Sequence, residues 1–247
     1  KGVKVAPGKQ DLIVSPEIAG IMVHESAGHP TEADRILGRE AAQAGESFVE
    51  RDSIGHKIGS PTVTIVDDPT VENSSGFYLY DDEGVPARRK YLYYKGKITE
   101  FLHNRESAAQ MNLKSNGSSR ANGYDREPIV RMSNTFVLPS KTPEDHLIKE
   151  VKKGIYLKSY TEWNIDDKRM NQKYVGAEAY LIENGKITKP VFHPILEITT
   201  PVLWSSVKEV GRNIEFHTGN CGKGEPQQGI PVWFGGPSML IKNVNIQ

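Results

Sequence analysis

Short runs of β-branched and aromatic residues, separated by turn-forming pairs, constrain the fold of this chain more than any other feature of its sequence. The clearest case is a run over residues 179–183, the pair Asn184-Gly185, and a second run over residues 186–188. Asn-Gly is the preferred pair of the type I′ turn that joins two antiparallel strands. Another two runs meet at Lys95-Gly96 in the same way. These patterns predict antiparallel hairpins.

Two further runs, over residues 61–66 and 77–80, have the composition of strands and end at acidic turn signals. By contrast, residues 112–123 are rich in Asn, Ser and Gly, and residues 219–236 are interrupted repeatedly by Gly and Pro. Both of these segments are expected to be loops, and the second contains the single cysteine, Cys221.

Helix signals occur in only a few places. Ser15 is a suitable N-cap and Pro16 suits the first helical position, after which apolar residues recur at helical spacing. A short helix is also expected over residues 143–153, and a mixture of helix and loop over residues 31–48. Because these helices lie among many hairpin strands, we expect an α+β fold with a mainly antiparallel, barrel-like sheet.

The composition is that of a globular chain without a strong charge. Its 247 residues carry 31 Lys and Arg against 31 Asp and Glu, which gives no general electrostatic reason to bind nucleic acid or an anionic membrane. No apolar run approaches the ~18 residues that span a bilayer, and the amino terminus lacks the apolar stretch of a signal peptide. We therefore expect a cytoplasmic protein without nucleic-acid or membrane partners. The length fits one large or two small domains, and the absence of an initial Met indicates a fragment or a processed form.

The segment His-Glu-Ser-Ala-Gly-His over residues 24–29 places two imidazoles five residues apart, with a glutamate directly after the first. In the HExxH motif of metalloproteases, two histidines bind Zn²⁺ and the glutamate accepts a proton from water. Here the spacing is one residue longer, so on a regular α-helix the two side chains would diverge by ~140°. A π-bulge, or unwinding at Gly28 beside Pro30, would bring the two rings together.

The lone cysteine is the third candidate ligand. Cys221 lies in a glycine-rich segment where a thiolate can approach a metal closely, and a His₂Cys set leaves a fourth position open, as catalytic zinc requires. The alternatives are two histidines without a shared role and an inert buried cysteine, which is the commoner fate of a single cysteine.

The sequence resembles the TldD/PmbA family of metalloproteases through five motifs, which follow the family's order across nearly the whole chain. These are HExxxH with a following acidic residue (residues 24–29 and Asp34), Asp-Asp-Glu-Gly (81–84), Arg-Met-Ser-Asn-Thr (131–135), an Ile-Glu-Asn-Gly hairpin (181–186) and Cys-Gly-Lys (221–223).

The resemblance implies a zinc site formed by His24, His29 and Cys221, with Glu25 as the catalytic base and the first two ligands on a metal-binding helix. It also implies that residues 1–247 form the family's carboxy-terminal catalytic domain and that the family's amino-terminal domain is missing from this chain. A homodimer, or a heterodimer with a related subunit, is the implied assembly.

Three departures from the family's pattern bear on this expectation. Ala33 stands where a glycine is usual before Asp34, residues 161–167 replace a glycine-rich stretch, and the segment over residues 224–228 is altered. The second departure puts a substrate preference inferred from the family in doubt, whereas the third leaves the candidate metal residues intact.

Three other residues are candidates for substrate binding. Asp81 and Asp82 suit the positive amino terminus of a peptide, and the forked donors of Arg131 suit a carboxylate. A solvated β-turn is the alternative interpretation of the two aspartates.

The sequence thus favours a zinc-dependent peptidase that hydrolyses small or unfolded peptides bound in extended form. Strand edges near a metal offer free N–H and C=O groups to a peptide backbone irrespective of its sequence. Two alternatives remain open, a metal-bearing peptide-binding subunit whose catalysis needs a partner chain and a metal hydrolase of a non-peptide amide. The presence of all four metal and base residues favours an active subunit over the family's paralogues that have lost the motif.

Overall fold

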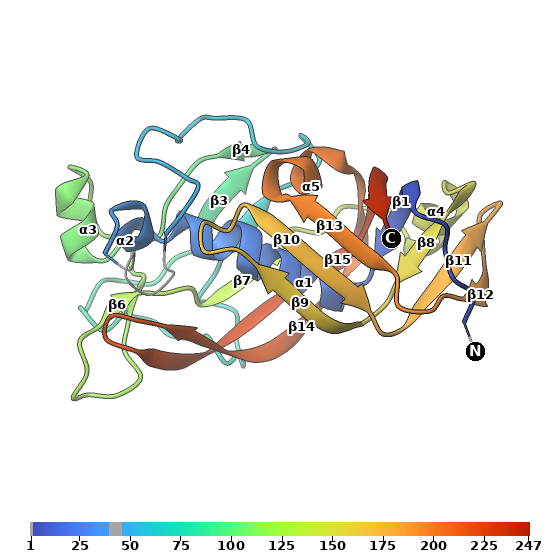
Figure 1. Ribbon diagram of the computed structural model, residues 1–247. Coiled ribbons are helices and arrows are strands. Elements are labelled where there is room, and N and C mark those ends of the chain that lie inside the picture. Colours follow the sequence, from blue (N-terminus) through green and yellow to red (C-terminus); the bar gives the residue numbers. More distant parts are fainter. Residues whose placement is uncertain (1, 40–45) are drawn as a thin grey trace.

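The structure is a computed structural model that describes residues 2–39 and 46–247. Helices are few and short in these ranges (Figure 1). The α-helices are α1 (Pro16–Val23), α2 (Ala33–Ile36), α3 (Arg105–Gln110), α4 (Glu144–Lys149) and α5 (Thr200–Ser206). One π-helical turn (His24–Gly28) and one 3₁₀ turn (His29–Thr31) continue α1 towards α2.

Strands make up most of the regular structure. The first eight are β1 (Gly8–Val14), β2 (Ile65–Asp67), β3 (Lys90–Tyr94), β4 (Lys97–Ile98), β5 (Ser119–Arg120), β6 (Ile129–Val130), β7 (Asn134–Val137) and β8 (Lys153–Leu157). The others are β9 (Tyr160–Ile165), β10 (Asn171–Gly176), β11 (Ala179–Glu183), β12 (Lys186–Pro190), β13 (Ile195–Thr199), β14 (Val207–Lys223) and β15 (Gln228–Ile246).

One 13-stranded sheet organises the molecule. Its main path runs β12-β11-β8-β1-β15-β7-β2-β3-β4; β14 and β13 also pair with β15, β10 pairs with β13, and β9 pairs with β10. The pairs β1–β8 and β15–β7 are parallel, and the other strand pairs of the described residues are antiparallel. The expected α+β fold with a mainly antiparallel sheet is therefore confirmed. The expected barrel closure is wrong, because β12 and β4 end the path without pairing with each other and the sheet stays open.

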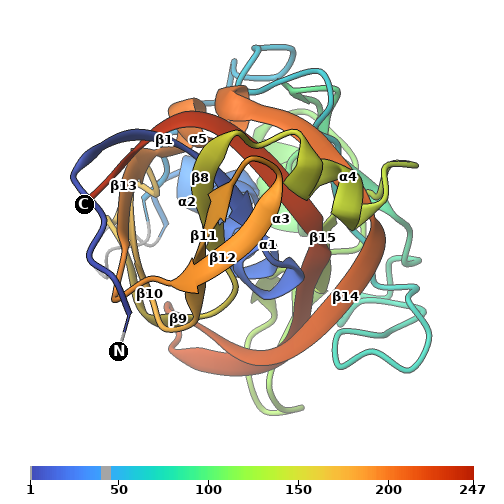
Figure 2. The same ribbon diagram turned by 90° about the vertical axis from the view of Figure 1, so that its right-hand side faces the viewer.

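Helix α1 lies inside the curved sheet. Its sequence is apolar on every side, and all of its residues except Glu17 are buried, as expected for a helix covered all round. The predicted start is confirmed, since the Ser15 hydroxyl accepts a hydrogen bond from the N–H of Ile18. Figure 2 shows strands around this helix. A Cβ atom at Gly20 would lie 3.0 Å from the backbone nitrogen of Gly235, so glycine lets α1 approach β15 closely.

The last part of the chain is a long hairpin and not the loop expected for residues 219–236. Strands β14 and β15 pair from Val207 to the turn that follows Lys223. Pro231 fits within β15 because its carbonyl oxygen faces away from β14, where it accepts a hydrogen bond from Arg120. The N and C=O of one residue in an antiparallel strand point to the same side, so the missing N–H costs no bond to β14.

The hairpins β3–β4 and β11–β12 are confirmed. The run over residues 61–66 is a strand only from Ile65, because residues 61–62 form a turn. Residues 77–80 are not a strand; Phe77, Leu79 and Tyr80 are exposed, and Tyr80 forms an isolated bridge with Pro86. Of the helix and loop expected over residues 31–48, the structure shows α2, and residues 40–45 lie outside the described residues.

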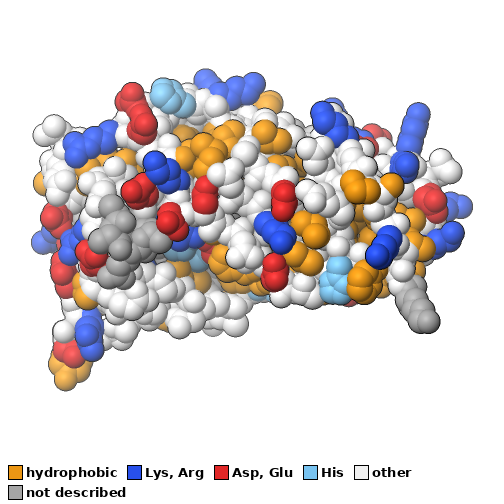
Figure 3. Space-filling view, viewed as in Figure 1, with side chains coloured by type: hydrophobic (Ala, Val, Ile, Leu, Met, Phe, Trp, Pro, Cys, Tyr) orange, Lys and Arg blue, Asp and Glu red, His pale blue; other side chains and the backbone are white. Residues whose placement is uncertain are grey.

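Charged side chains of both signs are interspersed over the face drawn in Figure 3, in keeping with the balanced composition. Within the described parts of the chain, no helix is long and apolar enough to cross a membrane.

Candidate metal centre

The π turn brings the two histidines of the motif onto one face. The N–H of His29 donates to the carbonyl oxygen of His24, five residues earlier, which closes the wider turn. The two rings then lie edge to face, with centroids 4.8 Å apart. The π turn therefore accommodates the one extra residue relative to HExxH. Of the two local changes that the spacing predicts, a π-bulge or unwinding at Gly28, the structure has the first.

Neighbouring side chains donate hydrogen bonds to carbonyl groups that lack their usual helical partners in this irregular turn. In a regular α-helix the carbonyl of Ser26 would accept from residue 30, but Pro30 has no N–H. The buried hydroxyl of Tyr93 donates to this carbonyl at 3.1 Å. The hydroxyl of Thr31 lies 2.8 Å from the carbonyl oxygen of Ala27. These contacts stabilise the turn that holds both rings.

Cys221 reaches the two rings from β14. Its Sγ lies 3.4 Å from Nε2 of His29, and the candidate ligand atoms of His24, His29 and Cys221 all lie within 4.8 Å of one another. All three residues are buried. Nδ1 of His24 has no hydrogen-bond partner among the described residues, although it is buried. Two imidazoles and one thiolate are suitable ligands for Zn²⁺, so these residues fit the metal that the sequence implies.

The surroundings favour the protonation states that bind metals. Burial lowers the pKa of His24 and the pKa of His29, which keeps both rings neutral. Burial alone would raise the pKa of Cys221, but the pairing with His29 and the charge of Arg131 outweigh it and lower that pKa below its usual value. Neutral imidazole and thiolate are the ligand forms.

Glu32 orients the ring of His29 through Nδ1, the ring nitrogen that does not face Cys221. Its Oε2 lies 2.8 Å from His29 Nδ1 and 2.7 Å from Arg35 Nε. Burial alone would raise the pKa of Glu32, but Lys223, His29 and Arg35 hold it well below its usual value. The carboxylate is thus ionised and accepts from Nδ1–H, which leaves Nε2 of His29 with a lone pair facing Cys221.

Lys223 belongs to the same buried cluster. Alternate residues of a strand share a face, so Lys223 follows Cys221 on the buried side of β14. Its Nζ lies 2.7 Å from Asp34 Oδ1 and donates to the carbonyl of Val130 at 2.6 Å. Two motifs that are distant in the sequence, HExxxH with Asp34 and Cys-Gly-Lys, are therefore in contact in the fold.

Glu25 and Arg169 line one cavity together with the candidate ligands. This cavity has a volume of about 380 Å³ and is walled by residues of α1, the π turn, β9, β14 and β15. The Glu25 side chain is 5% exposed, and its Oε2 lies 2.7 Å from Nη1 of Arg169. Tyr160 and Trp163 of β9 also line the cavity.

The predicted substrate-binding residues lie elsewhere. Arg131 is fully buried and donates to the backbone carbonyls of Cys221 and Gln228, so it positions the hairpin. The Asp81 carboxylate accepts from backbone N–H groups in its own turn, and Asp82 accepts from Ala121 N–H at 2.7 Å. None of the three lines the cavity of the candidate ligands, and their substrate role stays a prediction.

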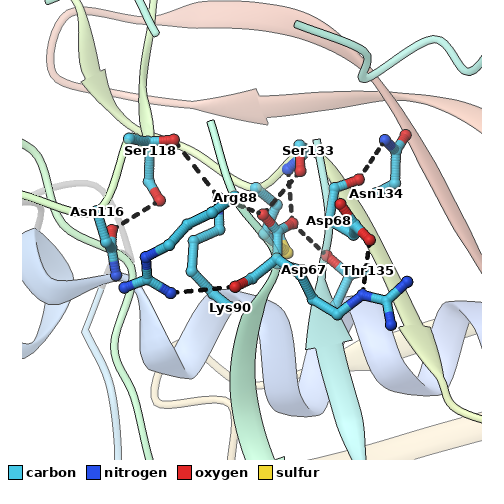
Figure 4. A network of polar contacts seen from close by, with 12 residues as sticks. Asp67, Asp68, Arg88, Lys90, Asn116, Ser118, Ser133, Asn134 and Thr135 are labelled. Carbon is cyan, nitrogen blue, oxygen red and sulfur yellow. Dashed lines mark hydrogen bonds and ion pairs between the residues drawn. The ribbon is translucent and has the colours of Figure 1, made fainter. Parts of the chain in front are cut away.

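The Arg-Met-Ser-Asn-Thr motif has a packing role in the structure (Figure 4). The Asp67 carboxylate accepts from the N–H and hydroxyl of Ser133 and from the hydroxyl of Thr135. Lys90 Nζ, also fully buried, lies 3.1 Å from Asp67 Oδ2. This network joins β2 and β7, and so fixes Met132 against the π turn, where a Cβ at Gly28 would lie 1.9 Å from its Sδ.

Sequence reasoning missed Arg169, Glu32, Tyr160 and Trp163. Arg169 is separated from Glu25 by 144 positions, and the pairing of β10 with β13 helps to bring its turn to the site. Glu32 carried a usable signal, because a residue three positions after His29 lies on the same side of a helical turn.

A buried His₂Cys donor set beside a glutamate, in an α+β domain, defines a candidate for the class of metal-dependent hydrolases. Residues 7–247 match the family model of the PmbA/TldA metallopeptidase C-terminal domain. The chain therefore belongs to the PmbA/TldD family.

Individual relatives agree with this family. A metalloprotease of Methanocaldococcus jannaschii is 37% identical over 229 residues, covering 93% of this chain and 49% of that protein. A zinc metalloprotease TldD homolog of Saccharolobus solfataricus is 28% identical over 247 residues, covering 100% of this chain and 53% of that protein. The fold also matches the crystal structure of TldE from Thermococcus kodakarensis, with a TM-score of 0.78 at 19% identity, over 99% of this chain and 51% of that one. The chain thus spans about half the length of the curated relatives it matches.

Proposed function

We propose that this chain is the catalytic part of a zinc-dependent peptidase that hydrolyses small or unfolded peptides bound in extended form. The observation that carries the proposal is the convergence of His24, His29 and Cys221 on one cavity that Glu25 also lines. One relative is named as a zinc metalloprotease, which supports the choice of metal.

When bound, zinc would act as a Lewis acid towards a peptide carbonyl and towards water. His24, His29 and Cys221 would hold it, as three protein ligands that leave one position open. Glu25 follows a ligand directly and has a carboxylate at the cavity wall, so it accepts the proton of the attacking water and later delivers it to the leaving amine. Burial of these groups excludes bulk water from the reacting atoms.

The walls of the cavity suit an extended backbone. β9 pairs only with β10, and residues Thr218–Gly222 of β14 pair only with β15 among the described residues. Both strands therefore present an unpaired edge to the cavity. A peptide between them would bond through its N–H and C=O groups with little regard to sequence. A folded protein would not expose that backbone.

We further propose that the protein works in the cytoplasm as a dimer with a second copy or with a related subunit. TldE of Thermococcus kodakarensis has the same fold, so a subunit with this fold is a candidate partner.

The test uses the full-length protein, loaded with zinc, on an unstructured peptide and on a folded protein before and after unfolding. We expect cleavage of the unfolded forms, and Glu25→Gln should keep its zinc while losing turnover by about 10²–10⁴-fold. Turnover retained by Glu25→Gln would contradict the assignment of the base. Faster cleavage of the folded substrate would contradict the extended-peptide proposal, and activity that appears only after a related subunit is added would favour the subunit alternative.

A further inference from the structure

We propose that Arg169 is the positioning residue for Glu25, held in place by a turn that is built to direct it into the cavity. This inference rests on the proposed function, because it deepens the role of the catalytic base. Neither the sequence motifs nor the family match assigns a role to this arginine.

The contact itself is short and largely buried. Nη1 of Arg169 lies 2.7 Å from Oε2 of Glu25, and the two side chains are 16% and 5% exposed. Among the described residues that line the cavity, Arg169 is the one Lys or Arg. Lys223 and Arg131 are directed to other partners, Lys223 to Asp34 and Arg131 to backbone carbonyls. The positive charge next to the base therefore comes from Arg169.

The backbone at Arg169 is strained in a way that serves the contact. Its φ angle is 63°, in the left-handed region that residues with a side chain seldom adopt. Asp166 holds this conformation, because its carbonyl accepts from Arg169 N–H at 2.9 Å and its carboxylate accepts from Met170 N–H at 2.7 Å. The turn between β9 and β10 is thus fixed from within.

Two other segments anchor the same turn. The Thr200 hydroxyl, at the start of α5, donates to the carbonyl of Arg169 at 2.6 Å, and Gln172 supports that hydroxyl from β10. Phe48 N–H donates to the carbonyl of Lys168 at 2.8 Å. A side chain on a turn anchored from three sides loses little freedom on forming its ion pair, unlike the long side chains of surface salt bridges.

The geometry assigns different tasks to the two oxygens of Glu25. Arg169 Nη1 donates to Oε2. This ion pair leaves the other oxygen, Oε1, available to accept a proton. Without the arginine the carboxylate would rotate, and small displacements of a catalytic group cost up to about 10²-fold in rate.

The test compares variants of the full-length protein on the unstructured peptide. We expect Arg169→Met to lower kcat by about 10–100-fold with KM and zinc content little changed. Arg169→Lys should recover part of the loss, because lysine keeps the charge without the fork. Low concentrations of guanidinium ion should raise the kcat of Arg169→Ala. The matched control is Lys168→Met, which removes an exposed cation from the same turn and should keep kcat.

A second measurement does not require activity. In the metal-free protein, Arg169→Met and Glu25→Gln should change the midpoint of urea unfolding non-additively, because each removes the same ion pair. Strictly additive changes, or unchanged kcat in Arg169→Met, would overturn the positioning role. If Glu25→Gln is inactive and Arg169→Met is fully active, this inference fails while the proposed function stands. If Glu25→Gln stays active, both fail.

Discussion

At the residue scale, the ring of His29 connects the candidate metal centre to a charged cluster behind it. Its Nδ1 contacts Glu32 Oε2, and Lys223 Nζ lies 3.5 Å from the same oxygen. Outer partners of this kind fix the tautomer and orientation of a metal-binding histidine. Metal affinity should therefore depend on Glu32, although Glu32 is not one of the candidate ligands.

We expect Glu32→Gln to weaken zinc binding by about 10–100-fold, because the amide no longer holds Nδ1–H of His29 as a carboxylate does. Competition with a zinc chelator measures the affinity. The matched control is Asp34→Asn. It removes the negative charge of another partner of Lys223, and Asp34 is not in contact with a candidate ligand. Asp34→Asn should lower the free energy of unfolding and leave zinc affinity near that of the unchanged protein. Equal zinc affinity in Glu32→Gln and the unchanged protein would contradict the orienting role.

The sequence identified the candidate ligands but not the residues that orient them. His24, Glu25 and His29 lie within six positions, so local spacing relates them directly. Cys221 was found because the chain has a single cysteine. Arg169 had no such signal, since an arginine in a polar turn is typical of solvent-exposed loops and its partner is distant in sequence.

At the element scale, the π turn is the structure on which the site depends. It is held by the Tyr93 hydroxyl and by the close packing of Met132 against Gly28. A side chain at Gly28 would displace Met132, because its Cβ would lie 1.9 Å from the Met132 sulfur. The glycine therefore sets how near the segment between β6 and β7 approaches the turn.

We predict that Gly28→Ala lowers the free energy of unfolding by about 1–3 kcal/mol, as overpacking does in a dense core. It should also weaken zinc binding, because Gly28 lies between the two histidines of the turn. Urea unfolding gives the first quantity. The matched control is Gly222→Ala, whose Cβ would meet its nearest neighbour at 3.6 Å and should change stability little.

The double variant Gly28→Ala, Met132→Ala tests whether the loss of stability comes from the steric clash with Met132 or from the effect of alanine on the backbone of the turn. If the clash is the cause, the double variant should unfold at a higher urea concentration than the sum of the two single changes predicts. An additive result would show that Met132 does not limit this position.

The same scale shows which elements the sequence could reveal. Hairpins with a two-residue turn, such as that at Asn184-Gly185, were predictable because the turn chemistry is local. The β14–β15 hairpin was not, because its glycines and Pro231 indicate a loop to any local reading. The fold explains why a glycine occurs in this strand. A Cβ at Gly235 would lie 2.3 Å from the carbonyl oxygen of Glu215 on the paired strand, so a side chain would clash there.

At the scale of the whole molecule, one sheet brings the parts of the site together. β15 pairs with β14, which carries Cys221, and β13 links β15 to the β9–β10 hairpin that carries Arg169. Helix α1, which leads into the π turn, packs on β15. Global stability and site geometry are therefore coupled, and conditions that weaken the fold should also weaken the site.

Acid is one such condition, and His103 supplies a specific reason. Burial lowers the pKa of His103 from its usual 6.5 to about 4 in the folded protein. Its Nε2 has no hydrogen-bond partner among the described residues, so a proton there would be buried without compensation. The unfolded chain takes up this proton first as the pH falls. The stability that neutral His103 allows is thus fully present above pH 6.5 and is lost as the pH falls towards 4.

The loss should amount to about 3 kcal/mol in the free energy of unfolding at pH 4, since a pKa difference of one unit corresponds to about 1.4 kcal/mol. Urea unfolding of the metal-free protein at several pH values between 7.5 and 4 measures it. The comparison is His103→Gln, which keeps a polar side chain at the same position but binds no proton. Its stability should fall less between these pH values than that of the unchanged protein, by the amount that His103 contributes. Parallel pH curves for the two proteins would mean that His103 is not the group through which acid destabilises the fold.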